Sequence, residues 1–153
     1  MSETSWVEVV GLVVSLVTAG SIIFAAIQIV AQTRQMHREF EALYVQRYWS
    51  LMDQHSVGFR RGMKPNKTDQ LVLVQYLQLC EDEIDLRRLG RVTDDTWRYW
   101  EQSIRAQAME SAYRGALRGS ARSDFPSLKK LLSSPNGYDP LIWSDVKKRW
   151  KGL

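Results

Sequence analysis

The side chains that most often carry out chemistry in proteins are scarce in this sequence. Its 153 residues include one cysteine, Cys80, and two histidines, His37 and His55. A lone cysteine excludes an internal disulfide, and three dispersed nitrogen and sulfur ligands do not make a zinc site. The sequence also lacks a phosphate-binding Gly-rich loop, a serine elbow and the HExxH and CxxC patterns. We therefore expect no catalytic residue, no metal ion, no cofactor and no enzymatic activity.

Carboxylates concentrate at one place only, at Glu81, Asp82, Glu83 and Asp85. Their spacing alone does not define an acid and a base. Glu83 lies three or four residues from apolar positions on both sides, which places it on the inward face of a helix. Because burying an unpaired carboxylate costs on the order of several kcal/mol, it needs a partner. We therefore predict a structural ion pair between Glu83 and an arginine of a neighbouring helix, Arg105 or Arg47.

A long apolar segment precedes all of these residues. Residues 9–30 include no charged side chain, and these 22 residues, at about 1.5 Å each in a helix, span roughly 33 Å, enough to cross a membrane. An acidic start and this length do not fit a cleaved signal peptide. No Lys or Arg precedes Arg34, so the positive-inside rule places the following chain in the cytoplasm. We expect a single-pass protein of a bacterial inner membrane, with residues 1–8 outside and residues 9–31 in the lipid.

Small and polar residues recur every three or four positions along this segment, on one face of the expected helix. Membrane helices associate through such residues, which allow close approach and hydrogen bonds across the interface. The pattern predicts contact with another membrane protein or a second copy of this chain. The alternative, that such residues are simply common in membrane helices, stays open. The predicted contact residues, called the small-residue stripe below, are Gly11, Ser15, Thr18, Ser21, Ala25 and Gln28.

The remaining chain has helical periodicity and no two-residue alternation of the kind that strands show. The membrane helix is expected to continue to a loop at residues 57–67, which is rich in glycine and proline. A central helix should begin at Thr68 or Asp69 and end at Gly90, and Thr93 should cap the next helix. The predicted fold class is therefore all-α, with one membrane helix continuing into a small cytoplasmic helical bundle.

That bundle is predicted to occupy residues 32–118, and residues 119–153 are predicted to form a basic helical extension. Short helices should start near Pro126 and at Asp139-Pro140, because proline is favoured in the first helical turn. Trp97 and Trp100, which follow the Thr93 cap at helical spacing, are expected to pack inward.

Positive charge collects at the C-terminal end. Residues 105–153 include ten basic and four acidic side chains, whereas residues 32–104 are balanced. Beside a membrane, basic residues gain about 1 kcal/mol each from anionic lipid, and they bind nucleic acid phosphates equally well. A solvated helix face is the third interpretation. The residues predicted to contact lipid or nucleic acid are Lys129, Lys130, Lys147, Lys148, Arg149 and Lys151.

Two segments carry a resemblance to a known family. The first is Tyr48-Trp49-Ser50-Leu51-Met52, and the second runs from the Cys-Glu-Asp-Glu sequence at Cys80 through Gly90 to Trp97. Together with the apolar start, they resemble a broad bacterial and phage-associated family of small membrane-anchored helical proteins without an assigned function. The resemblance covers most of residues 8–110, with Glu83, the Gly90 turn and the tryptophan helix as its best part. It implies a helical cytoplasmic domain without established enzymatic activity, and the chain after residue 118 departs from it.

Two functions follow as expectations. The first is a non-enzymatic accessory, assembly or scaffolding subunit that binds membrane proteins through the small-residue stripe and the cytoplasmic helices. The second is a membrane-tethered phage-exclusion or host-defence factor whose basic tail binds nucleic acid or anionic lipid.

Overall fold

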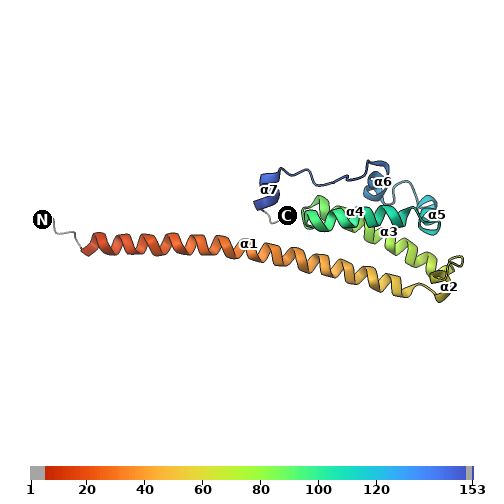
Figure 1. Cartoon of the computed structure of the whole chain (residues 1–153), viewed down its shortest axis with the longest axis horizontal. Helices are drawn as coiled ribbons and strands as arrows, with labels where there is room; N and C mark the ends of the chain where they lie inside the picture. The colour runs from red at the N-terminus through yellow and green to blue at the C-terminus, as the bar shows by residue number, and fades with distance from the viewer. Residues whose placement is uncertain (1–5, 151–152) are drawn as a thin grey trace.

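The computed structural model describes residues 6–150 and residue 153. Throughout these residues the regular structure is helical and no strand is present, which confirms the predicted all-α fold. One long helix runs the length of the molecule, and shorter helices fold back along its second half (Figure 1). In chain order the helices are α1 (Trp6–Gln54), α2 (Val57–Arg60), α3 (Lys67–Arg88), α4 (Asp94–Ala108), α5 (Ser111–Gly119), α6 (Pro126–Ser133) and α7 (Asp145–Trp150).

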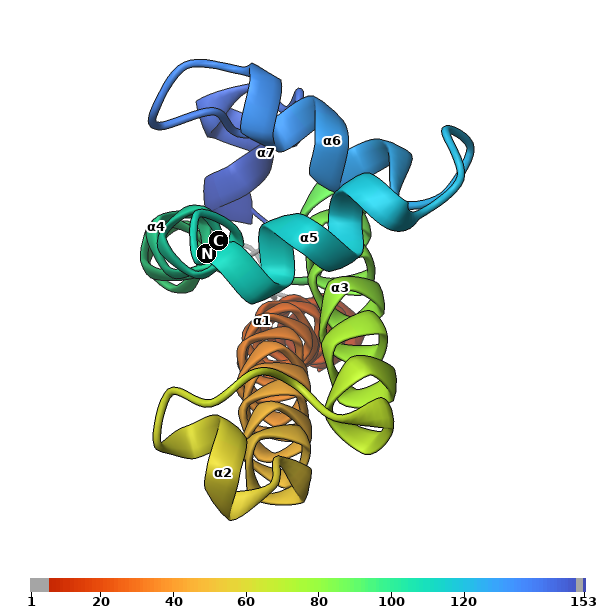
Figure 2. The ribbon, with the colours of Figure 1, turned by 90° about the vertical axis from the view of Figure 1, so that its right-hand side faces the viewer.

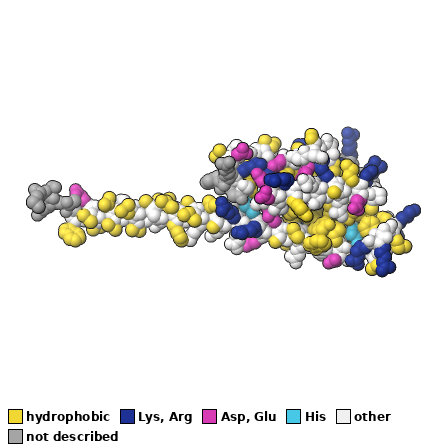
Figure 3. All heavy atoms as spheres, viewed as in Figure 1, with side chains coloured by type: hydrophobic (Ala, Val, Ile, Leu, Met, Phe, Trp, Pro, Cys, Tyr) yellow, Lys and Arg dark blue, Asp and Glu magenta, His cyan; other side chains and the backbone are white. Residues whose placement is uncertain are grey.

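Helix α1 has two halves with different surroundings. It is unbroken over 49 residues because it has no proline, and its two glycines lie in the apolar half. The most apolar window is not buried anywhere within the protein, and Leu16, Ile22 and Phe24 are each more than 60% exposed. Figure 3 shows this half as a rod of hydrophobic side chains that leaves the bundle. The structure therefore has one helix long and apolar enough to cross a membrane, continuous with a second half that packs on α3.

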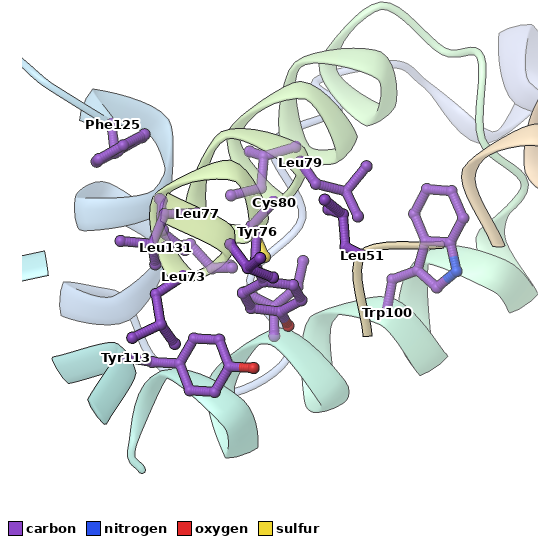
Figure 4. Packing of buried hydrophobic residues seen from close by; sticks show 14 of the residues in the cluster. Leu51, Leu73, Tyr76, Leu77, Leu79, Cys80, Trp100, Tyr113, Phe125 and Leu131 are labelled. Carbon is purple, nitrogen blue, oxygen red and sulfur yellow. The ribbon is translucent and has the colours of Figure 1, made fainter. Parts of the chain in front are cut away.

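Helix α3 lies beside α1 (Figure 2) and is in contact with α1, α5 and α6. Its buried apolar side chains form the core together with Leu51, Trp100, Tyr113 and Leu131 of the other helices and with Phe125, which directly precedes α6 (Figure 4). The helix begins at Lys67, slightly before the predicted Thr68 or Asp69. Asn66 is the cap, because its side chain accepts the Asp69 N–H while Asp69 accepts the Asn66 N–H.

The turn after α3 contains Gly90, where the sequence predicted the end of the central helix. Gly90 has a φ of +69°, a conformation that glycine adopts without strain. Thr93 caps α4 as expected, and its hydroxyl accepts the Thr96 N–H. Trp97 and Trp100 are buried as expected, with 4% and 9% of their surfaces exposed.

Helix α6, within the predicted C-terminal extension, packs into the same core as the preceding helices. Helix α6 begins at Pro126 as predicted, and its Leu128 and Leu131 are fully buried against α3. Its first two N–H groups, of Ser127 and Leu128, donate to the Glu81 carboxylate at 2.8 and 2.7 Å. A carboxylate from α3 thus stabilises the start of α6 and fixes it to the bundle.

The prediction that the last helix starts at Asp139-Pro140 was wrong, because α7 begins at Asp145. Asp139 does accept the Leu141 N–H, as the cap of a helix would, and its carboxylate also accepts from Arg87, but no helix follows it directly. The intervening chain is irregular and brings the Trp143 ring against Gly90. As a result, α7 lies at the end of the bundle from which the apolar half of α1 projects (Figure 1).

Candidate functional site

The small-residue stripe lies on the exposed half of α1. All six residues are exposed, and each hydroxyl donates to the carbonyl four residues before it, at 2.8 Å for Ser15, Thr18 and Ser21. The hydroxyls therefore already have acceptors within α1, while their oxygens remain able to accept from another helix. The structure leaves this face free of any contact with the bundle.

The predicted basic residues that the structure describes lie on two helices, α6 and α7. Lys129 donates to the Ala121 carbonyl at 2.7 Å, and Lys130 lies over the Tyr138 ring. At the other end of the segment, Lys147 lies 4.0 Å from the centre of the Trp143 ring, and Lys148 lies 3.4 and 3.3 Å from Asp94 and Asp139. All four lysines have partners within the protein. The Arg149 side chain and Lys151 lie outside the described residues.

The predicted pairing of Glu83 with Arg105 is not what the structure shows. Arg105 pairs with Glu101, one turn earlier on α4, and donates to the Pro135 carbonyl at 2.8 Å. The other candidate, Arg47, pairs with Asp82 at 3.1 Å. Glu83 is buried as expected, with 8% of its surface exposed, but it has no hydrogen bond or ion pair with any described residue.

Glu83 faces a pocket of about 420 Å³ between α1, α3 and α4, called the aromatic pocket below. Helix α1 supplies Tyr48 and Trp49, α3 supplies Tyr76, and α4 supplies Tyr99 and Trp100. Tyr48 packs edge-on against both Trp49 and Tyr76, with ring centres 5.3 and 6.1 Å apart. Tyr76 is buried, whereas Trp49 and Tyr99 are 60% and 73% exposed. The pocket therefore has a buried floor with a carboxylate and an exposed aromatic mouth.

The electrostatics of the pocket follow from burial. Desolvation and the nearby Asp82 charge raise the pKa of Glu83 to about 8, and the attraction of Arg47 offsets only part of this shift. Burial likewise raises the pKa of Tyr76, Tyr48 and Cys80. Cys80 is 1% exposed, so its thiol is a protonated core group and not a nucleophile.

A second polar group lies at the far end of the bundle, beside a groove of about 950 Å³. Asp69 is fully buried and accepts from the N–H and hydroxyl of Ser56, both at 2.8 Å. His55 places Nδ1 3.5 Å from Asp69 and Nε2 3.4 Å from the Tyr113 hydroxyl. Burial raises the pKa of Asp69, but the hydrogen bonds outweigh this effect and lower it to about 2. Asp69 is thus an ionised group that joins α3 to the segment after α1.

Sequence reasoning missed both the aromatic pocket and the Asp69 network. The exposure of Trp49 depends on how α1 and α4 are oriented around α3, which the sequence does not show. For Asp69, the capping pattern Asn66-x-x-Asp69 was a usable signal, because it places a carboxylate at a helix start. Within residues 6–150, no three His, Cys, Asp or Glu side chains come together as a metal site.

No family model, curated protein or solved structure matches the chain. The resemblance carried by residues 8–110 stays a prediction.

Proposed function

We propose that this chain is a single-pass membrane protein that acts as a non-enzymatic accessory or assembly subunit, with α1 as both its anchor and its contact with other membrane proteins. The observation that carries the proposal is the structure of α1. Its apolar half has no contact with the bundle, while its second half is part of the core through Leu51. A continuous helix of this kind holds the bundle at a fixed distance and orientation from whatever surrounds the apolar half.

Exposure of the apolar half supports a membrane location. Burying a large aliphatic side chain is worth about 1.5–3 kcal/mol, so a row of exposed ones is unfavourable in water. Leu12, Leu16 and Ile23 are each more than 60% exposed. Lipid is the surrounding that removes this cost over a length of about 30 Å.

Charge at the end of the apolar half supports a cytoplasmic bundle. Arg34 and Arg38 follow the span on α1, and Arg91 lies beside them because its guanidinium contacts Met36 and the Phe40 ring. The positive-inside rule places such a group on the cytoplasmic side of a bacterial inner membrane.

The small-residue stripe supports association within the membrane. It is exposed along its whole length, and its side chains are small enough to let another backbone approach. The partner in this proposal is another membrane protein or a second copy of the chain.

The rival function, a defence factor with a basic nucleic-acid-binding tail, has less support. Lys129, Lys130, Lys147 and Lys148 are divided between α6 and α7 and engaged with carbonyl, aromatic and carboxylate groups of the protein. Moving Lys148 to a phosphate would break its contacts with Asp94 and Asp139.

The test of membrane association combines topology with partner recovery. We expect a C-terminal fluorescent fusion to be bright and a C-terminal alkaline phosphatase fusion to be inactive in a bacterial host. The full chain, purified in mild detergent, should bring down a stoichiometric partner or migrate as an oligomer. Ser15→Leu combined with Thr18→Leu should reduce this recovery several-fold, because the larger side chains block close approach.

The matched control adds bulk away from the stripe. At about 100° per residue, Val13 and Gly20 lie on the side of α1 opposite the stripe. Val13→Leu combined with Gly20→Leu should leave the complex intact. If recovery of the partner or oligomer fell equally in both double variants, or fell in neither, this would count against the small-residue stripe as the contact surface.

A further inference from the structure

The Glu83 carboxylate is the one buried acidic side chain of the described chain that lacks a hydrogen bond and an ion pair. The other buried carboxylates, Asp69, Glu81 and Glu101, accept from two or more groups each. The oxygens of Glu83 are not fully enclosed, because His55 Nδ1 is the one buried side-chain nitrogen or oxygen of the described residues without a partner, so the Glu83 carboxylate is open to the pocket. Because an ionised carboxylate only accepts hydrogen bonds or pairs with a cation, a ligand that binds its ionised form carries donors or positive charge.

The side chains that line the aromatic pocket indicate which kind of ligand would bind beside Glu83. Rings of Tyr48, Trp49, Tyr76, Tyr99 and Trp100 line it. The faces of aromatic rings carry negative partial charge and attract cations, most strongly when the cation is poorly hydrated. Alkylated ammonium groups are the cations of this kind, and aromatic cages are their usual binding sites.

We propose that the aromatic pocket binds a small water-soluble quaternary ammonium compound, with the cation held between the Glu83 carboxylate and the surrounding aromatic rings. The pocket volume of about 420 Å³ is in the range of small-molecule sites. Trp49 and Tyr99 at the mouth give access from water, and the buried floor supplies the charge.

The position of the pocket favours a soluble ligand over a lipid headgroup. On α1 its residues begin at Val45, which lies 14 residues beyond the predicted end of the span at residue 31. At about 1.5 Å per residue this is roughly 21 Å from the membrane, beyond the headgroup layer.

The charges around Glu83 define how binding depends on pH. From α1, Arg47 faces it, and from α3, Asp82; these two pair with each other at 3.1 Å. Helix α4 contributes no charged side chain to the pocket. Tyr48, Tyr76 and Cys80 have raised pKa values and stay protonated at neutral pH. Because the pKa of Glu83 is about 8, binding of a permanent cation should release one proton to the buffer below that pH.

The experiment is calorimetric titration of the full chain with choline, a quaternary ammonium probe whose charge does not change with pH. The protein is held in a sugar-based detergent, because a phosphocholine detergent would itself present the ligand. We expect saturable binding of choline at pH 9 and no binding of 3,3-dimethylbutan-1-ol, its uncharged isostere. The apparent affinity should fall roughly tenfold for each pH unit below about 8.

Two variants test the residues. Glu83→Gln keeps the shape and removes the charge, so it should weaken choline binding at least about tenfold and abolish the pH dependence. Trp49→Leu keeps an apolar side chain at the mouth but removes a ring face, and should weaken binding several-fold. Asp53→Asn, which removes an exposed carboxylate from α1 outside the pocket, is the matched control and should bind as the native chain does.

Several results would overturn the proposal. Equal binding of choline and its uncharged isostere would show an apolar pocket without cation recognition. Unchanged choline binding by Glu83→Gln would show that Glu83 does not hold the cation. No binding by the native chain at pH 9 would show that the aromatic pocket is not a quaternary ammonium site. Finally, loss of choline binding in phosphatidylcholine nanodiscs but not in phosphatidylglycerol nanodiscs would show that a lipid headgroup occupies the pocket, contrary to a soluble ligand.

Discussion

The Arg87 guanidinium donates from Nε to the carboxylate of Asp139 at 2.9 Å, across 52 residues of sequence. Arg87 is 1% exposed and also pairs with Asp94 and donates to the Val92 carbonyl at 2.7 Å. One side chain of α3 thereby joins the start of α4 to the segment that leads to α7. Burial raises the pKa of both aspartates, but the hydrogen bonds from Arg87 outweigh this and hold each pKa below its usual value.

Loss of the Arg87 charge should be strongly destabilising. Arg87→Met keeps most of the side-chain volume but removes the guanidinium from the Val92 carbonyl and from two carboxylates, which then keep only Lys148 as a cationic partner. Breaking a buried pair from one side costs about 3–5 kcal/mol, and we expect an effect at the low end because Asp94 is 43% exposed. The measurement is thermal unfolding of the full chain in detergent, followed by circular dichroism.

The adjacent residue provides the control for this change. Arg88 is 62% exposed and pairs only with Asp85, three residues away. Arg88→Met should cost no more than about 1 kcal/mol, as exposed pairs do. If both variants unfold at the same temperature, Arg87 does not hold the C-terminal segment in place.

The turn at Gly90 should tolerate no side chain. Its φ of +69° costs a non-glycine residue about 1–2 kcal/mol, and a Cβ there would lie 2.5 Å from the Trp143 ring. Gly137→Ala measures the backbone cost of a positive φ alone, because Gly137 has a φ of +79° and open space around its Cβ position. We expect Gly90→Ala to lower the Tm more than Gly137→Ala does. Adding Trp143→Ala to Gly90→Ala removes the clash with the ring. It should therefore restore only the part of the Tm loss that exceeds the loss in Gly137→Ala, and a double-mutant cycle measures this part.

Acid should weaken the far end of the bundle through Asp69. Its pKa is lowered to about 2, so its contribution is complete above the unfolded value of about 3.9 and is lost as the pH falls through about 2. Asp69→Asn should therefore lower the Tm at pH 7, and the difference from the native chain should shrink between pH 4 and pH 2. Asp53→Asn, at an exposed position, should show no such pH-dependent difference. A constant difference at all pH values would mean that the Asp69 charge contributes nothing.

The helices with strong local signals could be predicted from the sequence. The uncharged run of α1, the Thr93 cap, the Gly90 turn and the Pro126 start each depend on residues within one or two turns. Asp139-Pro140 carries a similar helix-start signal and makes the cap-type bond to the Leu141 N–H, yet the next helix begins only at Asp145. Nothing in the local sequence indicates the contact of Asp139 with Arg87, which lies 52 residues earlier.

The candidate site was predictable only in part, for the same reason. Helical periodicity correctly placed Glu83 on a buried face, because the neighbouring Ile84 and Cys80 belong to the core. Its partner could not be found this way, because Arg105 has a closer carboxylate in Glu101, one turn away on α4. The aromatic pocket arises from the relative placement of three helices, which side-chain spacing along one helix does not determine.

The unpaired state of Glu83 leads to a stability prediction opposite to that for an ion pair. Its pKa is about 8 in the folded chain and about 4.3 in the unfolded chain, so the folded state holds the proton more tightly. Below pH 4 both states are protonated and the group has no effect on the free energy of unfolding. As the pH rises from 4 to 8, the unfolded state releases its proton first, and the native chain loses stability by on the order of a few kcal/mol.

Glu83→Gln should remove this loss, because glutamine does not titrate. The variant and the native chain should unfold at similar temperatures near pH 4, and the variant should become the more stable of the two by pH 8. All other titrating groups are shared, so they cancel in the difference between the two chains. The measurement is the Tm of both full-length proteins in sugar-based detergent from pH 4 to pH 9. A variant less stable than the native chain at pH 8 would show that Glu83 has a partner that stabilises its charge.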